Sequence, residues 1–382
     1  MSYGGCKSPK VNIQGHTLTT REEYKYLGYI ENKKSRAAKH MRDRSIKMKK
    51  ALNFFLGITE ALDRLPIKRR QIMAKACVET VGLYGTEVMP TEVSYSRIRE
   101  EMEIAQRKFA RVILNANQST ANEVVTMELK LSSVKALMDF KLLIFRERMM
   151  REKGTLNALI FHLNKTRNLD WEKRCKKILK EYGIEDCKNR EEEKRNTDWK
   201  WRWEAREKIY MKEAERRREA LNQKKTTSDF IRLGGTIISD LPEYLTHNSN
   251  MKFATGLIFQ LRGGSNFTNA CKYTRHLTQD PTCPSCGAEV EDTRHLIEKC
   301  EAYQEERDDI RKYLEKTLGN ITKKYNIEEI TLGENIYEEE LKETINIDER
   351  KEIDRQIKRF IEKIFKKRRQ YEKTKTTQTT KK

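Results

Sequence analysis

Residues 281–300 read PTCPSCGAEVEDTRHLIEKC, and this segment places four soft metal ligands in the order Cys283, Cys286, His295 and Cys300. Their spacing is Cys-x2-Cys-x8-His-x4-Cys. Three thiolates and one imidazole form a ligand set that Zn²⁺ accepts in a closed tetrahedral site, which leaves no open position for a substrate. The spacing therefore predicts a structural zinc ion rather than a catalytic one.

The residues between the ligands are typical of a zinc knuckle. Pro284 and Gly287 flank the first cysteine pair, as in a tight turn whose backbone N–H groups face two sulfurs. His295 and Cys300 are five residues apart, about 140° around an α-helix, so an unbroken helix would not easily aim both at one ion. We expect a short helix that begins near Thr293 and ends before Cys300. The alternative is a set of reduced cysteines and a histidine in an ordinary helical protein.

The composition favours long helices with solvated faces over a compact sandwich. Apolar residues make up 37% of the 382 residues and charged residues 36%, against a usual charged fraction of about a quarter. The prediction is a mostly α protein of two or three domains. A net charge of +21 is typical of a protein that binds a phosphate backbone, although a basic protein without such a partner has the same composition.

Targeting signals are missing from the sequence. No apolar run approaches the roughly 18 residues of a membrane helix, and the first residues lack the charged and apolar regions of a signal peptide. We expect a soluble, intracellular protein without a membrane partner. The cysteines outside the metal motif are expected to be reduced thiols: Cys6, Cys77, Cys175, Cys187 and Cys271.

The N-terminal region combines a β signal with a strongly basic helix. Residues 11–13 and 24–30, joined through Gly15, predict one β-hairpin, and residues 33–57 predict a helix. Nine Lys or Arg residues face two acids over residues 31–50. Such a run is usually a solvated face, but charges of one sign repel one another without an anionic partner. We therefore predict phosphate contacts by Lys33, Lys34, Arg36, Lys39, Arg42, Lys47, Lys49 and Lys50, and by a rim near the metal motif, Arg262, Lys272 and Arg275.

The stretch 165–225 is highly charged and contains the sequence WKWRW. On a helix Trp199 and Trp203 share a face while Trp201 points away, so one of the set is expected to be exposed. The three rings either pack against another helix or stack on bases between the neighbouring cations.

The C-terminal residues 351–382 carry thirteen Lys or Arg residues against four acids and end in the polar sequence KTKTTQTTKK. Such an ending cannot bury a core, so we expect it to be disordered. The segment FKKRRQ, residues 365–370, is either a nuclear import signal or a further set of phosphate contacts.

Several segments follow one another in a distinctive order: IQGHTL, YKYLGYI, KALNFFLG, LPIKRRQIMAKACVETVGLYGTEV, RKFARVIL and KFATGLIFQLRGG, followed by the Cys/Cys/His/Cys segment with its HLIEKC ending. This order resembles the C-terminal part of non-LTR retrotransposon reverse transcriptases. The resemblance covers roughly residues 10–115 and 250–305 of the 382. In that family the YLG strand follows the catalytic palm near the primer grip, and the next helices form the thumb.

The resemblance, together with the composition, implies a division of the chain into six parts. These are palm-end strands in residues 1–30, a thumb-like helical domain in 31–160, a charged helical linker in 161–228, a zinc-knuckle region in 229–305, a charged helical segment in 306–365 and a disordered basic tail in 366–382.

The sequence departs from this family in the residues that the polymerase reaction needs. A polymerase of this kind needs a hairpin with an aromatic-x-Asp-Asp motif and an upstream Asp to hold two Mg²⁺ ions, whereas the only Asp-Asp pair here, Asp308 with Asp309, lies in a helical pattern. We expect a non-catalytic chain that binds RNA or DNA, holds zinc, uses no small-molecule substrate and is intracellular or nuclear. The alternatives are a truncated form of an active RNA-directed DNA polymerase and a helical scaffold for protein partners.

Overall fold

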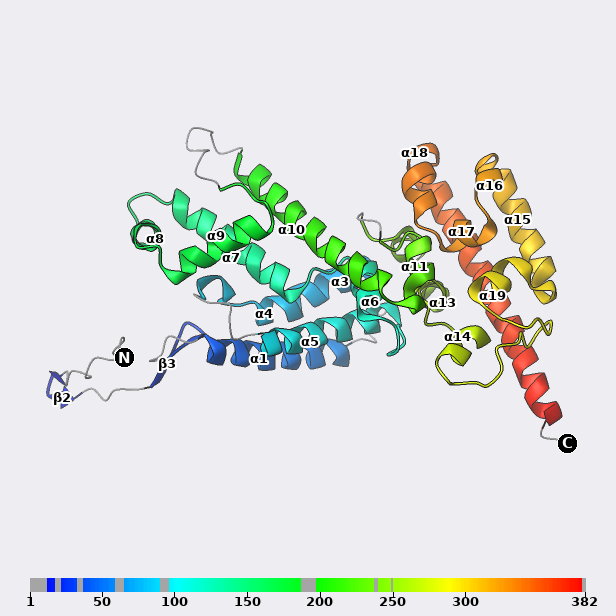
Figure 1. Ribbon diagram of the computed structural model, residues 1–382, viewed down its shortest axis with the longest axis horizontal. Helices are drawn as coiled ribbons and strands as arrows, with labels where there is room; N and C mark the ends of the chain where they lie inside the picture. The colour runs from blue at the N-terminus through cyan, green and yellow to red at the C-terminus, as the bar shows by residue number, and fades with distance from the viewer. Residues whose placement is uncertain are drawn as a thin grey trace. The chain divides into compact units, whose positions relative to one another are not determined.

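The computed structural model describes residues 12–17, 22–32, 37–58, 65–89, 96–186, 197–236, 240–248 and 250–379 (Figure 1). Most of these residues are helical. The β-strands among them form two small antiparallel hairpins. The prediction of a mostly α protein is confirmed. Within the described part of the chain, no helix combines the length and the apolar character needed to cross a lipid bilayer.

The chain divides into two units, each assembled from separate stretches of sequence. The first unit comprises residues 1–58, 74–106 and 132–213, and the second comprises 59–73, 107–131 and 214–382. The division falls inside three of the described helices, α3 (Ile67–Ala74), α5 (Ser96–Leu114) and α10 (Thr197–Asn222).

Two β-hairpins precede the helices of the first unit, where the sequence predicted one. Strand β1 (Asn12–Ile13) pairs with β2 (His16–Thr17), and β3 (Glu23–Tyr26) pairs with β4 (Tyr29–Asn32). The single predicted strand over residues 24–30 is therefore two strands with a turn between them.

The turns explain the second hairpin. Gln14 and Gly15 have φ angles of 49° and 81°, and Leu27 and Gly28 have φ angles of 45° and 85°. Two successive positive φ angles are typical of the two-residue type I′ turn, whose second position favours glycine. Gly28 within YKYLGYI is the sequence signal for this turn, and the prediction of a single strand over residues 24–30 overlooks it.

His40 connects the second hairpin to α1 (Ala38–Gly57). The Ile30 N–H donates to His40 Nδ1 at 3.2 Å, and His40 Nε2 donates to the Tyr84 carbonyl at 2.8 Å. The Tyr29 ring lies against the imidazole, with 4.2 Å between ring centroids. One ring nitrogen accepts and the other donates, so this arrangement needs the neutral imidazole. Burial, which is the largest effect, lowers the pKa of His40 below its ordinary value of 6.5.

The remaining described elements of the first unit are helices and one-turn segments. They are the π-helix η1 (Lys75–Glu79), α4 (Thr80–Gly82), the 3₁₀ turn η2 (Thr86–Val88), α7 (Val134–Arg151), α8 (Leu156–Thr166) and α9 (Asp170–Glu181).

A core of the first unit lies where we expected a charged linker. Trp171, Ile178 and Trp201 are buried in one cluster with Leu142 and Leu143 of α7. Although residues 161–228 are mostly charged, α9 and α10 each bury apolar side chains along one face, including Trp171 and Ile178 of α9 and Trp201 of α10. The linker interpretation is therefore wrong for this stretch, because overall composition hid an amphipathic pattern.

The second unit contains the remaining described helices. They are α3 (Ile67–Ala74, whose last residue falls in the first unit), α6 (Asn122–Glu128), η4 (Lys225–Thr227), α11 (Ser228–Arg232), α12 (Glu243–Thr246), α13 (Lys252–Arg262), α14 (Asn269–Thr274), the π-helix η5 (His295–Lys299), η6 (Glu301–Tyr303), α15 (Gln304–Leu318), α16 (Ile321–Lys324), α17 (Ile327–Leu332), the π-helix η7 (Tyr337–Leu341), α18 (Lys342–Thr344) and α19 (Ile347–Thr379).

The long helix α19 replaces most of the disordered tail that we expected over residues 366–382. It packs against α13 and α15, and it is one continuous helix to Thr379 (Figure 1). Ile364 continues its buried stripe, and Arg368 is buried in an ion pair with Glu291. Packing against the second unit therefore stabilises a segment whose composition alone predicted disorder.

The hairpin formed by β3 and β4 should loosen in acid. In the folded state His40 stays neutral, whereas the unfolded chain takes up a proton below about pH 6.5. The unfolded state then binds more protons, so the stability that His40 contributes is present above pH 6.5 and is lost as the pH falls below it. We expect hydrogen exchange of the amides in residues 23–32, corrected for intrinsic rates, to be faster at pH 5 than at pH 7.5.

The control is His40→Gln, in which the amide can accept and donate but does not titrate in this range. Its hairpin should exchange with little change between the two pH values. An equal pH dependence in the variant would contradict the assignment to His40.

Candidate metal centre

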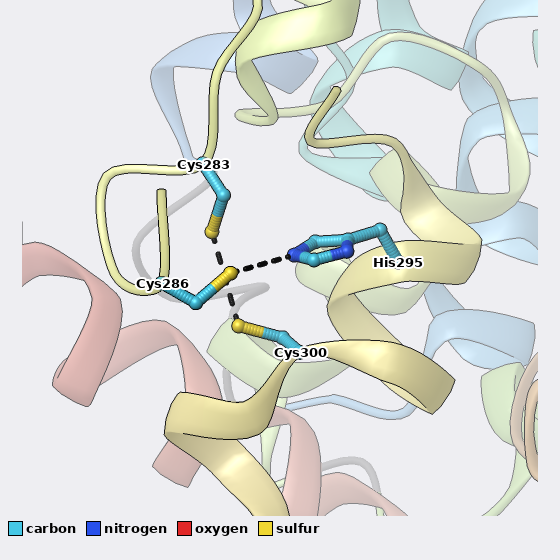
Figure 2. A group of neighbouring side chains, drawn as sticks. All are labelled: Cys283, Cys286, His295 and Cys300. Carbon is cyan, nitrogen blue, oxygen red and sulfur yellow. Dashed lines mark hydrogen bonds between the residues drawn. The ribbon is translucent and has the colours of Figure 1, made fainter. Parts of the chain in front are cut away.

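The four predicted ligands converge in the second unit. Their ligand atoms all lie within 4.8 Å of one another (Figure 2). The Sγ atoms of Cys283 and Cys300 are 3.8 Å apart, and Cys286 Sγ lies 3.3 Å from His295 Nε2. Two thiolates bound at about 2.3 Å to one tetrahedral ion lie about 3.8 Å apart. The group could therefore hold a metal ion, and it is compatible with a structural zinc.

The first two ligands sit on the predicted tight turn. The Cys283 N–H donates to the Ala288 carbonyl at 2.8 Å, and the Gly287 N–H donates back to the Cys283 carbonyl at 3.0 Å. Gly287 has a φ of 80°, a backbone conformation that favours glycine. The turn brings Cys286 round to the side on which Cys283 lies (Figure 2).

The other two ligands are aligned by a π-helical turn. The helix begins at Thr293, continues as η5 from His295 and ends at Lys299, before Cys300, as the sequence predicted. The Cys300 N–H donates to the His295 carbonyl at 2.8 Å, an i to i+5 bond. Such a turn is wider than an α-helical one, so the residue five positions on lies closer to the same face. This turn overcomes the angular offset that an α-helix would impose on the two ligands.

The ligand segment is tied to α19 through a buried ion pair. Arg368 Nε and Nη2 donate to the two carboxylate oxygens of Glu291 at 2.6 and 2.7 Å. Both side chains are fully buried. Glu291 Oε2 also accepts from the Asn269 backbone N–H at 2.7 Å, and Cys283 Sγ lies 3.9 Å from Glu291 Oε1. The carboxylate therefore connects a ligand, α14 and α19.

Two further contacts position the ligand-bearing backbone. Ser285 Oγ and the hydroxyl of buried Tyr303 are 2.6 Å apart. Arg307 Nη2 donates to the Cys300 carbonyl at 2.7 Å. Neighbouring groups of this kind orient metal ligands and limit their movement.

The four ligands differ in exposure and in protonation. Cys283 and Cys300 are buried, whereas Cys286 is exposed and His295 is half-buried. The hydrogen bond with Cys300 lowers the pKa of the Cys283 thiol to about 4 and raises that of Cys300 above its ordinary range. The pair thus readily holds one thiolate, which is the form that binds metal ions.

Arg262, predicted to contact phosphates, is instead a buried structural residue. Its Nε donates to Glu128 Oε1 at 2.9 Å, and its Nη2 donates to Glu334 Oε2 at 3.3 Å. The guanidinium also donates to the Leu332 carbonyl and lies 5.4 Å from the Tyr244 ring centroid. The prediction is wrong, because two acids distant in sequence enclose the cation.

Lys272 and Arg275 are also engaged within the second unit. Lys272 Nζ lies 3.0 Å from Glu372 Oε1 on α19. Arg275 donates to the hydroxyls of Ser119 and Ser265 at 2.6 and 2.7 Å and to the Gly264 carbonyl at 2.9 Å. The side chains of the predicted basic rim therefore mainly contact other residues of the second unit.

The cations predicted on residues 33–57 fall into three groups. Lys33, Lys34 and Arg36 lie outside the described residues. Lys39 pairs with Glu23, while Lys47 Nζ and Lys49 Nζ each lie 2.8 Å from a carboxylate, that of Asp43 and of Glu101 respectively. Arg42 and Lys50 are exposed and have no ion-pair partner among the residues that the structure describes.

The tryptophans of α10 follow the predicted faces. Trp201 is 3% exposed, and its indole N–H donates to the Glu185 carbonyl at 3.1 Å. Trp199 and Trp203 are 66% and 57% exposed. Packing therefore accounts for the central ring only. The segment 365–370 is also partly structural, since Arg368 within it is buried.

Compared with protein-family models, with curated proteins and with solved structures, the chain matches none. The resemblance to reverse transcriptases therefore stays a prediction.

The ion pair between Arg368 and Glu291 can be tested with neighbouring arginines. Arg368→Met leaves a buried carboxylate without its cation, a change that typically costs about 3–5 kcal/mol. We expect the second unit to melt at a lower temperature, and bound metal to pass faster to a chromogenic chelator. Arg369→Met removes the same charge from an exposed neighbour and should leave both measurements unchanged. Equal effects of the two substitutions would contradict the role of the ion pair.

Proposed function

We propose that this chain binds nucleic acid and that a structural zinc ion stabilises the knuckle in its second unit. The observation that carries the proposal is an exposed stripe on α1. Arg42, Ile46, Lys50 and Phe54 follow one another at intervals of four residues, which places them along one side of the helix. Ile46 is 49% exposed and Phe54 is 71% exposed. We call these four residues the α1 stripe.

Among the residues that the structure describes, the acids paired with α1 are fewer than its cations. Helix α1 carries six Lys or Arg residues and one acid, Asp43. When Glu23 and Glu101, which pair with its lysines, are included, a surplus of three positive charges is left. Positive charges of one sign repel each other, and an anionic partner would relieve that repulsion.

The side chains of the α1 stripe suit a polynucleotide. Arg and Lys contact phosphates and release condensed counterions, which supplies most of the affinity without sequence information. An exposed phenyl ring offers a surface on which a base can stack. The alternation of cations with apolar groups therefore fits a chain of phosphates and bases.

The metal centre fits a structural rather than a catalytic zinc. All four positions of a tetrahedral ion would be filled by this chain, because three sulfurs and one imidazole converge. Two of the sulfurs are buried, and a buried carboxylate restrains the segment that carries them. The four ligands, bound to one ion, would hold the two halves of the knuckle together.

A retroelement origin is part of the proposal and rests on the order of the segments named above. The Asp308–Asp309 pair lies on α15, where Asp308 accepts a hydrogen bond from Gln304 one helical turn earlier. This helical setting differs from the strand hairpin that a polymerase uses for Mg²⁺. We therefore propose a binding role without nucleotide transfer by this chain.

A second candidate function is a helical scaffold for protein partners, and α8 favours it. Four aliphatic side chains of this helix are exposed at helical spacing: Leu156, Leu159, Ile160 and Leu163. Exposed apolar surfaces of this kind often mark protein contacts. Failure of the chain to bind RNA or DNA even at low salt would favour this candidate.

The test of nucleic-acid binding is the salt dependence of affinity for a short duplex. Each phosphate neutralised on a duplex contributes about −0.9 to the slope of log K against log salt. Changing Arg42 and Lys50 together to Ala should therefore weaken binding to all sequences alike and reduce the magnitude of the slope by about 2.

The matched control removes two positive charges from the same helix at Lys47 and Lys49, which already pair with acids. It should change the slope less than the first double substitution. Equal slopes for the two variants would show that only total charge matters. An unchanged slope after the Arg42 and Lys50 substitutions would contradict the proposal for the α1 stripe.

A further inference from the structure

Two tryptophan side chains of α10 lie on the surface of the first unit. Trp199 and Trp203 are 66% and 57% exposed, whereas Trp201 between them is 3% exposed. We propose that Trp199 and Trp203 stack on successive bases of a single-stranded nucleic acid while Arg206 contacts a phosphate beside them. We call these three residues the α10 row. The inference rests on the proposed function and adds to the α1 stripe a contact that only an unpaired strand can make.

The members of the α10 row lie along one side of the helix. Their spacing is i, i+4 and i+7, so each side chain lies about one turn further along the same face. Four residues of an α-helix span about 6 Å along its axis. Neighbouring bases of a duplex strand are about 3.4 Å apart and cover each other's faces. An unpaired strand can extend, and its successive bases can then stack on successive aromatic rings.

Both indole rings are left largely to solvent. Neither ring has a hydrogen bond, a ring contact or a cation contact among the residues that the structure describes. An indole carries one of the largest apolar surfaces of any side chain, so burial of the two rings would be favourable. A ligand with flat apolar faces would cover them, and every nucleic acid base has such a face.

The charge beside the α10 row favours an anionic ligand. Arg206 is exposed and has no ion-pair partner among the described residues. The pKa of Lys75 on η1 is lowered, mainly by burial and further by the charge of Arg206, while Glu79 opposes the shift. Arg206 therefore lies close enough to Lys75 for the two cations to repel each other, and a phosphate would relieve that repulsion. Lys200 and Glu207 flank the α10 row with opposite charges.

The α10 row differs in chemistry from the exposed face of α8 in the same unit. The α8 face presents four aliphatic side chains, a surface that suits a protein partner. The α10 row presents two planar aromatic rings followed by a guanidinium. Aromatic rings interleaved with cations bind single strands with little dependence on their sequence. The observations therefore favour an unpaired polynucleotide over a protein as the ligand of the α10 row.

The four tryptophans of the chain allow a direct test by fluorescence. Trp171 and Trp201 are buried in the core of the first unit, so a bound strand can stack only on Trp199 and Trp203. A 12-nucleotide oligothymidine should quench part of the emission and shield it from acrylamide, whereas a 20-base-pair duplex should do neither. In the double variant Trp199→Leu and Trp203→Leu, oligothymidine should leave the remaining emission unchanged.

The same double variant tests what stacking contributes to affinity. Loss of the two rings should weaken oligothymidine binding by about tenfold or more and leave duplex affinity unchanged. The matched control is Tyr24→Leu with Tyr26→Leu, which removes two exposed aromatic rings from β3 of the same unit. The control should change neither affinity. All four rings are exposed, so both double variants should keep the melting temperature of the wild-type chain.

A charge variant tests the phosphate contact. Arg206→Gln should reduce the magnitude of the salt slope for oligothymidine by about 0.7, the contribution of one phosphate on a single strand. Lys208→Gln removes the same charge from the other side of α10, where Lys208 Nζ donates to the Gly183 carbonyl at 2.7 Å. This control should change the slope less than Arg206→Gln does.

The outcomes separate this inference from the proposed function. Binding of the wild-type chain to neither oligothymidine nor duplex would overturn both. Duplex binding that persists, while the two Trp substitutions leave oligothymidine affinity unchanged, would overturn the assignment of the α10 row alone. Self-association of the chain that the two Trp substitutions abolish, with no effect on oligothymidine binding, would also overturn it and assign the α10 row to a contact between two copies.

Discussion

The convergence of three sulfurs and one imidazole is the constraint on which the arrangement of residues 283–300 depends. Residues 283–300 bury few large apolar side chains, so a hydrophobic core alone would not hold this segment in place. The glycine turn after Cys286 and the π-helical turn before Cys300 are both needed to bring the ligands together. The ion pair between Glu291 and Arg368 connects the ligand segment to α19, and α19 packs against α13 and α15.

Buried cations explain why the net charge overstates the basic surface that this chain could offer to an anion. Arg146, Arg262, Arg307 and Arg368 are among the largest fully buried side chains of the described residues. Arg146 donates to Glu172 in the first unit, and Arg262 donates to Glu128 in the second. A basic residue enclosed by acids contributes to net charge but offers nothing to a phosphate. The proposal therefore rests on the exposed cations of the α1 stripe, Arg42 and Lys50.

Local features of the fold were predictable from the sequence, and long-range ones were not. Ligand spacing predicted the metal group, and helical periodicity predicted that Trp201 would point away from Trp199 and Trp203. The partner of Arg262 lies 134 residues away and that of Arg368 lies 77 residues away, distances over which no local pattern reports contact. Composition predicted a linker where α9 lies in a core, and a disordered tail where α19 continues. Charge content does not report which face of a helix is apolar.

The central claim is that a single zinc ion is bound by Cys283, Cys286, His295 and Cys300. X-ray absorption spectroscopy of the purified full chain, together with its metal content, tests this claim most directly. The account predicts one zinc per chain, with three sulfur ligands at about 2.3 Å and one nitrogen ligand at about 2.0 Å. A chain that is folded without zinc, or a first shell dominated by oxygen, would contradict it.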